Sequence, residues 1–160
     1  MARAPRKPVD PWEAALAALA RRALTEAEIR RKLSRKGVPD AAIDEVLARL
    51  RRLRYVDDRE VAYNHAARRA REGRRGSLRV FRELLARGID GELAREAVDA
   101  AYPREEDRER ARAALSRLSP GGVPRDPGGR ARLFRKMVRQ GFAAGEVRAL
   151  LDEVDDDGIP

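Results

Sequence analysis

The chain has 160 residues, of which 39% are charged and 4% aromatic, and its formal net charge is +9. This composition argues against a single thick globule, and the absence of cysteine excludes disulfides and thiolate metal sites. The positive charge indicates a polyanion or an acidic protein surface as partner. No stretch approaches the roughly 20 apolar residues of a membrane span, and the first residues lack the apolar region of a secretory signal. We therefore expect a cytoplasmic protein.

The residue types along the chain predict helix almost throughout. Alanine, leucine, arginine and glutamate dominate, and runs of β-branched residues are missing. Glycine and proline fall mainly between segments whose apolar residues have helical spacing. We therefore expect an all-α, elongated protein that begins with a disordered N-terminal arm at residues 1–10.

A weak internal repeat is visible when the chain is aligned on Gly37, Gly88 and Gly141. Apolar residues stand eight and four positions before each glycine, one position after it, and nine and ten positions after it. These are Ile29, Leu33, Val38, Val46 and Leu47, then Val80, Leu84, Ile89, Ala97 and Val98, then Leu133, Met137, Phe142, Leu150 and Leu151. Each copy is predicted to contain a helix, a glycine C-cap and a second helix.

The spacing of the glycines leaves room for a third helix in each copy. We place these additional helices at about 12–23, 57–72 and 104–118. The fold prediction is therefore an array of three tandem three-helix repeats, at 11–54, 55–102 and 103–154, followed by an acidic tail at 155–160. The segment 119–130, "SPGGVPRDPGGR", interrupts the third repeat and is interpreted as a hinge, because glycine and proline disfavour a continuous helix.

The stretch from Tyr55 to Asp58 raises the question of whether two adjacent carboxylates have a chemical role. Asp57 with Glu60 fits a capping box, so Asp57 is predicted to accept the free N–H groups at a helix start, and Asp58 to place negative charge there. Adjacent residues of a helix point in different directions, which argues against joint metal ligation. We interpret the stretch as the junction between repeats, with Tyr55 and Val56 packed inward.

Positive charge is concentrated between residues 68 and 87, which hold eight arginines against two glutamates. We predict that most of these arginines form a partner-binding or DNA-binding surface, the first basic patch: Arg68, Arg69, Arg71, Arg74, Arg75, Arg79 and Arg82. The apolar side of the helix at about 75–87 is assigned to Leu78, Val80, Phe81, Leu84 and Leu85. A second basic patch follows the capping box of Thr25 and Glu28 and consists of Arg30, Arg31, Lys32, Arg35 and Lys36; a solvated helix face is its alternative interpretation.

Catalytic motifs are missing from the sequence. It contains no glycine-rich phosphate loop, zinc pattern or activated nucleophile, so we expect no enzyme activity, no metal and no cofactor. His65 is expected to be a half-buried packing or hydrogen-bonding residue. Trp12, Tyr63 and Phe142 are interpreted as core anchors and not as base-stacking platforms, because each lies beside apolar helical neighbours.

Two stretches resemble the RecX family of regulatory proteins, over a match from about Ala14 to Leu151. They are "ALARRALTEAEIRRKLSRKGVPDAAIDEVLARLRRLRYVDDREVAYNHAARRAR" and "GSLRVFRELLARGID". The resemblance implies a curved stack of three three-helix repeats without enzymatic activity. It also implies a partner: such proteins bind in the groove of the RecA filament on single-stranded DNA, inhibit ATP hydrolysis and strand exchange, and limit filament growth during DNA repair and the SOS response.

Two other functions remain open at this point. The helix-turn-helix layout at 25–50 suggests a repressor that binds DNA directly. Its second helix, however, carries Asp40, Asp44 and Glu45, whereas a recognition helix presents hydrogen-bond donors to bases and phosphates. A plain scaffold, whose charge only keeps it in solution, is the third possibility.

Overall fold

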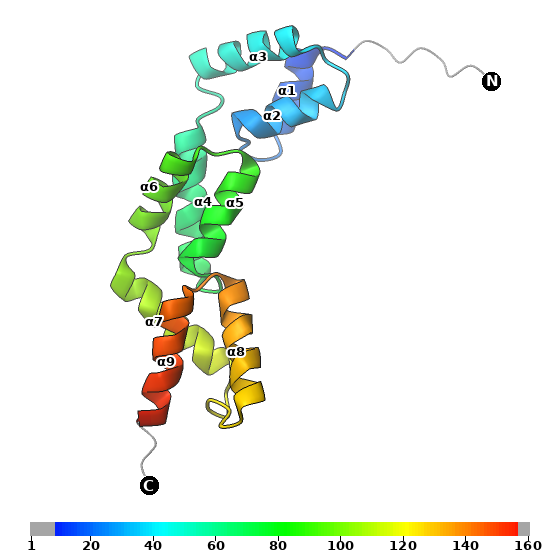
Figure 1. Cartoon of the computed structure of the whole chain (residues 1–160). Helices are drawn as coiled ribbons and strands as arrows, with labels where there is room; N and C mark the ends of the chain where they lie inside the picture. Colours follow the sequence, from blue (N-terminus) through cyan, green and yellow to red (C-terminus); the bar gives the residue numbers. More distant parts are fainter. Residues whose placement is uncertain (1–8, 157–160) are drawn as a thin grey trace, which may run out of the picture. The chain divides into compact units, whose positions relative to one another are not determined.

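The computed structural model describes residues 9–156, with side chains as far as Glu153 (Figure 1). Every regular element in this range is helical, which confirms the all-α prediction. The helices are α1 (Pro11–Leu19), α2 (Glu26–Ser34), α3 (Asp40–Arg52), α4 (Asp58–Glu72), α5 (Ser77–Arg87), α6 (Gly91–Ala101), α7 (Arg104–Leu118), α8 (Pro127–Gln140) and α9 (Ala144–Asp156). The predicted arm at 1–10 and tail at 155–160 lie outside the described residues, apart from Val9, Asp10 and the helical backbone of 155–156.

The chain divides into two compact units. Unit 1 consists of Met1–Val61 together with Arg87–Ile89, and unit 2 consists of Ala62–Ala86 together with Asp90–Pro160. Helix α4 therefore begins in unit 1 and continues in unit 2, and the turn after α5 belongs to unit 1. Within the described range, no helix is both long and apolar enough to cross a membrane.

The core of unit 1 lies between α1, α2 and α3, each of which contacts the other two. Ile29 and Leu33 of α2, Ile43 and Leu50 of α3, and Ala15 of α1 are almost completely buried. Four-residue and seven-residue spacing places the apolar residues of α2 and α3 on one face of each helix. Burial of these faces, and not helix propensity alone, holds the three short helices together.

The C-terminal core of unit 2 has the same construction from α7, α8 and α9, which also contact one another in pairs. Leu133 and Met137 of α8 face Val147 and Leu150 of α9, and Phe142 fills the turn between the two helices at 1% exposure. Every apolar position of the predicted glycine-centred repeat is buried, in all three copies.

The three repeat glycines end their helices in the left-handed conformation. Their φ angles are +81° at Gly37, +87° at Gly88 and +95° at Gly141, values that favour glycine because it has no Cβ. The N–H of Val38 donates to the carbonyl of Leu33 at 3.2 Å, which is the bond of a Schellman C-cap. The predicted glycine C-caps are therefore confirmed.

One predicted helix end is wrong, and the predicted hinge is shorter than expected, at 119–126. The first helix ends at Leu19 instead of about residue 23, because Leu24 is buried and Thr25 already caps α2, so that 20–23 form the connection. In the predicted glycine and proline hinge, α8 begins at Pro127. Proline is compatible with the first turn of a helix, and Asp126 caps this turn by accepting the N–H of Gly129 at 2.7 Å.

Three apolar side chains predicted to lie inward are exposed. Tyr55 is 55% exposed, whereas its neighbour Val56 is buried as predicted. On α5, Leu78 and Leu85 are also more than 40% exposed. The buried face of α5 is therefore narrower than its apolar composition suggests. Glycine stands where the backbone before α5 approaches the turn after α8. A Cβ on Gly76 would lie 2.4 Å from the carbonyl oxygen of Gly141.

Helix α3 ends in a Schellman cap that lacks the usual glycine. Arg54 has a φ of +55°; its N–H donates to the carbonyl of Arg51 at 3.0 Å, and the N–H of Tyr55 donates to that of Leu50 at 2.9 Å. A side chain in this conformation costs about 1 kcal/mol relative to glycine. We therefore expect Arg54→Gly to raise the free energy of unfolding by about 1 kcal/mol in urea denaturation. Arg52→Gly, inside α3, is the control and is expected to lower it by a similar amount.

Candidate functional site

Glu83 of α5 gathers three members of the first basic patch. Its carboxylate accepts the Nε–H of Arg69 at 3.0 Å, contacts Nη1 of Arg75, and lies 3.5 Å from Nε of Arg79. His65 of α4 adds its Nε2 atom at 3.0 Å. Burial and the neighbouring Arg69 and Arg79 lower the pKa of Arg75. In this Glu83 cluster, part of the positive charge is compensated inside the protein.

The remaining arginines of the first basic patch point their charge to solvent. Nε of Arg68 lies 4.0 Å from a carboxylate oxygen of Glu72. Such a long contact at an exposed site contributes little to stability. Arg71, Arg74 and Arg82 are exposed and form no ion pair with any described residue. These three guanidinium groups are free to bind an external anion without first breaking an internal contact.

A further basic surface on α8 was not predicted from the sequence. Its members, the α8 basic stripe, are all exposed and form no ion pair within the described part of the chain: Arg132, Arg135, Lys136 and Arg139. Their spacing of three and four residues, which was present in the sequence, places them on one side of the helix. They line a surface pocket together with Ser119 and Pro124. Arg79 donates to the carbonyl of Arg139 at 3.4 Å, so the stripe adjoins the first basic patch.

The second basic patch lies on α2 and is partly engaged within unit 1. Arg30 forms an ion pair with Asp44 of α3, and Arg31 donates to the carbonyl of Arg87 at 3.2 Å. Lys32 is half-buried and Lys36 is exposed, and neither has an ion pair among the described residues. Arg35 also donates to the carbonyl of Arg31 at 3.3 Å, so three members of the patch have contacts within unit 1. Partner binding by this patch stays a prediction.

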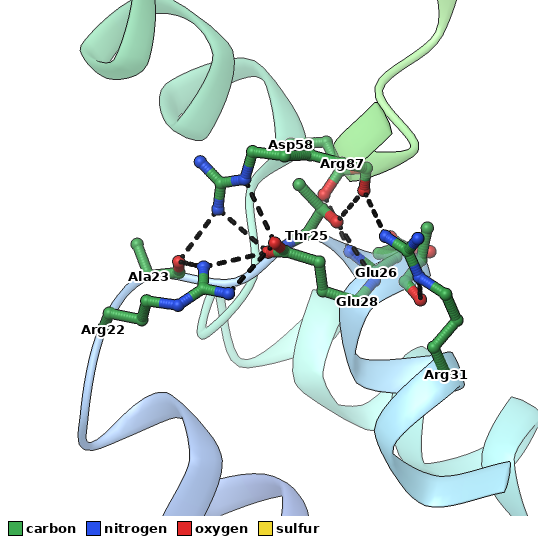
Figure 2. Close-up of polar contacts among 9 residues, drawn as sticks. Arg22, Ala23, Thr25, Glu26, Glu28, Arg31, Asp58 and Arg87 are labelled. Atoms are coloured by element: carbon green, nitrogen blue, oxygen red, sulfur yellow. Dashed lines mark hydrogen bonds and ion pairs between the residues drawn. The ribbon is translucent and has the colours of Figure 1, made fainter. Parts of the chain in front are cut away.

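Figure 2 shows a polar network at the start of α2, within unit 1. Glu28 accepts two hydrogen bonds from Arg87, at 2.9 and 3.2 Å, and two from Arg22, at 3.1 and 3.2 Å. It also accepts the N–H of Thr25 at 3.0 Å, while the N–H of Glu28 donates to Oγ1 of Thr25 at 3.1 Å. The predicted capping box is therefore confirmed, and its Glu28 also accepts hydrogen bonds from two arginines.

Burial alone would raise the pKa of Glu28, but the hydrogen bonds from Arg87, Arg22 and Thr25 outweigh it and lower the pKa to about 2. Thr25 is fully buried and donates from Oγ1 to the carbonyl of Arg87 at 2.7 Å. The network therefore holds the turn Arg87–Ile89 against α2 with ionised and neutral hydrogen bonds. The network is therefore a structural junction, in which each polar side chain has a hydrogen-bond partner.

The two aspartates of the 55–58 stretch cap different helices. Asp57 accepts the N–H of Glu60 at 3.0 Å, as predicted for the start of α4. Asp58, which we expected to act on the same helix, accepts the N–H of Glu26 at 2.9 Å and so caps α2 (Figure 2). Burial raises the pKa of Asp58, Asp57 adds to this effect, and the bond from Glu26 opposes it. Both carboxylates have structural partners.

The other residues considered for chemistry also have packing roles. His65 is 8% exposed and lies in the Glu83 cluster, as expected for a hydrogen-bonding residue. Phe142 is a core anchor, Trp12 is half-buried and packs against the core of unit 1, and Tyr63 is half-buried. Across residues 9–153, no three histidine, aspartate or glutamate side chains converge as metal ligands would.

Comparison with known proteins identifies relatives along most of the chain. Residues 12–50 match the family model described as RecX, first three-helix domain. The chain is 36% identical over 142 residues to the regulatory protein RecX of Deinococcus radiodurans, covering 88% of this chain and 66% of the relative. It is 33% identical over 146 residues to that of Halorhodospira halophila, covering 91% and 88%. The chain spans only 57% of the RecX of Bacillus licheniformis, to which it is 31% identical over 150 residues, 92% of this chain.

Solved structures show the same fold. The crystal structure of RecX from Lactobacillus salivarius superimposes with a TM-score of 0.77 at 19% identity, covering 91% of this chain and 94% of that one. A second crystal structure, of a regulatory protein RecX, also gives a TM-score of 0.77 at 19% identity, over 89% of this chain and 71% of that one. At this level of identity the comparison establishes the helical architecture.

Proposed function

This chain belongs to the RecX family of regulatory proteins, and we propose that it is a negative regulator of the RecA recombinase. In this proposal it binds in the groove of the RecA filament on single-stranded DNA and inhibits ATP hydrolysis, strand exchange and filament growth. The observation that carries the proposal is the 33% identity to a regulatory protein RecX along 88% of that protein's length.

The charge distribution supports a filament as partner. A filament on single-stranded DNA presents phosphates along its length, and binding to such a polyanion is favoured by many separate cations. Unit 2 carries free guanidinium groups at Arg71, Arg74 and Arg82 and the α8 basic stripe beside them. Distributed charges of this kind steer association and orient the partner, and they require no deep pocket.

The free arginines of the first basic patch provide the test. We expect the triple variant Arg71→Glu, Arg74→Glu and Arg82→Glu to bind at least about tenfold more weakly to RecA filaments assembled on single-stranded DNA with a non-hydrolysable ATP analogue. The stability of the variant should change little, because none of the three side chains is part of the Glu83 cluster. Fluorescence anisotropy with labelled filaments measures the affinity, and circular dichroism checks the fold.

A charge-matched control replaces three other exposed, unpaired arginines by glutamate: Arg104, Arg117 and Arg125. Equal losses in the two triple variants would show that net charge alone is responsible and would contradict a specific binding surface. A salt series separates the partners, since loss of three phosphate contacts should lower the slope of log affinity against log salt concentration by about three. Tight, sequence-specific duplex binding without RecA would favour the repressor instead.

A further inference from the structure

Unit 1 carries a stacked pair of aromatic rings, of which one is exposed and the other half-buried. Trp12 of α1 and Tyr55, which follows α3, are stacked with their ring centroids 6.4 Å apart and their planes 29° from parallel. The guanidinium carbon of Arg49 lies 3.9 Å from the centroid of the Trp12 ring. Tyr55 remains 55% exposed, so its ring retains a large surface that no described residue covers.

Tyr55 follows a residue in an unfavourable backbone conformation. Arg54 adopts φ +55° without being glycine, and Tyr55 follows directly, at the position where the comparable caps place buried Val38 and Phe142. Such conformations persist at a cost and are concentrated at functional sites. An arginine where glycine would be more stable, followed by an exposed aromatic ring, indicates that both side chains are used outside the protein core.

The surroundings of the ring pair are positively charged. Arg49, Arg52 and Arg54 are exposed, and none forms an ion pair with a described residue. The two nearby aspartates, Asp57 and Asp58, direct their carboxylates at backbone N–H groups of α4 and α2. The guanidinium groups beside Tyr55 are therefore available to an anionic partner.

We propose that Tyr55, supported by Trp12, is a stacking platform for an unpaired base of a single-stranded nucleic acid, and that Arg52 and Arg54 contact the adjoining phosphates. Aromatic faces next to arginines are the combination that binds single strands without sequence preference, because every base has a π-face. This site was not predicted, because Tyr55 was expected to lie inward. Trp12, assigned to the core, does pack against the core of unit 1. The inference goes beyond the proposed function, since it requires no recombinase.

The occupant follows from the combination of groups. Tyrosine and arginine are also common at protein–protein interfaces, so a protein partner is the alternative outcome of the test. A duplex would offer phosphates but no exposed base face, because its bases are stacked on one another. A single strand supplies both the phosphate and the π-face.

The test is a double-mutant cycle between Tyr55 and the base, without RecA. Affinity is measured by anisotropy for a labelled oligothymidylate and for an otherwise identical strand that has abasic sites. We expect wild type to bind the abasic strand about tenfold more weakly and Tyr55→Ala to bind both strands with that same weaker affinity. Tyr55→Phe, which keeps the ring, should behave as wild type. Oligouridylate in place of oligothymidylate shows whether DNA or RNA is preferred.

Two further readouts keep the proposal falsifiable. A strand containing 5-iodouracil should cross-link to Tyr55 on irradiation, with the modified peptide identified by mass spectrometry. Additive effects in the cycle, or equal affinity of wild type and Tyr55→Ala for oligothymidylate, would overturn the proposal. If Tyr55→Ala weakened binding to RecA filaments alone, Tyr55 would contact protein instead. The base-stacking site would then be refuted while the proposed function stands.

Discussion

Replacing Gly141 by alanine is expected to lower the free energy of unfolding of unit 2 by about 3 kcal/mol or more. The left-handed backbone, with φ +95°, costs a residue with a Cβ about 1–2 kcal/mol. A Cβ at this position would also lie 2.3 Å from the Cβ of Arg79 and 2.4 Å from its backbone nitrogen. Relief requires separation of α5 from α8, and overpacking of this kind costs a further 1–3 kcal/mol. Urea unfolding followed by circular dichroism measures the loss.

Two other glycines separate these effects. Gly37 has φ +81° but open space where a Cβ would lie, so Gly37→Ala should cost only about 1 kcal/mol. Gly145 lies in α9 with neither constraint, and alanine there should be neutral or slightly stabilising. Similar losses at Gly37 and Gly141 would show that the contact between α5 and α8 adds nothing.

The second large effect is expected at Glu28. Glu28→Gln should lower the free energy of unfolding of unit 1 by about 3 kcal/mol at neutral pH, because it leaves Arg87 and Arg22 without their shared counter-charge. Arg87 is only 19% exposed, so solvent cannot replace the carboxylate. The chain contains one tryptophan, and Trp12 packs against the core of unit 1. Its fluorescence therefore reports unfolding of this unit during urea titration.

The dependence of the unfolding free energy on pH is an independent test of the Glu28 effect. The pKa of Glu28 is about 2 in the folded protein, below the ordinary value of 4.5. A depressed carboxyl pKa contributes stability that is fully present above the ordinary pKa and is lost as the pH falls through the folded pKa. The difference in stability between wild type and Glu28→Gln should therefore shrink as the pH falls from about 4.5 to about 2.

Glu45 provides the control for Glu28. It is exposed on α3 and forms no ion pair with a described residue, so Glu45→Gln should change the stability by less than about 0.5 kcal/mol. If Glu28→Gln were equally mild at neutral pH, the network of Figure 2 would be a set of weak surface contacts and not a junction of unit 1.

The helical fold was predictable from the sequence because its main signals are local. Glycines at helix ends and apolar residues at helical spacing identified the buried positions, including Met137 and Phe142, without any long-range information. The capping box of Thr25 and Glu28 was visible for the same reason. The start of α8 was not predicted from local residue types. The helix begins inside a segment where glycine and proline were expected to prevent helix formation.

The interaction surfaces were only partly predictable, because charge compensation depends on tertiary contacts. From the sequence alone, the arginines of the first basic patch that form ion pairs could not be told apart from those that stay free. The fold then brings Glu83 of α5 against Arg69 of α4, so only some of the arginines remain free. The cap that Asp58 supplies to α2 joins residues far apart in the chain, and no spacing rule predicts such a partner.

The exposure of Tyr55 could not be predicted from its type. Tyrosine has both an apolar ring and a polar end, so it occurs in cores and at binding surfaces. The left-handed conformation of Arg54, directly before it, has no signal in the sequence either, because arginine rarely adopts it. The α8 basic stripe, by contrast, was detectable from its spacing, because residues 132–139 hold four cations and no acidic residue.

RecA-dependent ATP hydrolysis on single-stranded DNA, titrated with this protein, tests the proposed function most directly. We predict that the hydrolysis rate falls progressively as wild type is added. The variant with glutamate at 71, 74 and 82 should require about tenfold more protein for the same inhibition. A hydrolysis rate that wild type leaves unchanged over the whole titration, with the filament intact, would contradict the proposal that this chain is a negative regulator of RecA.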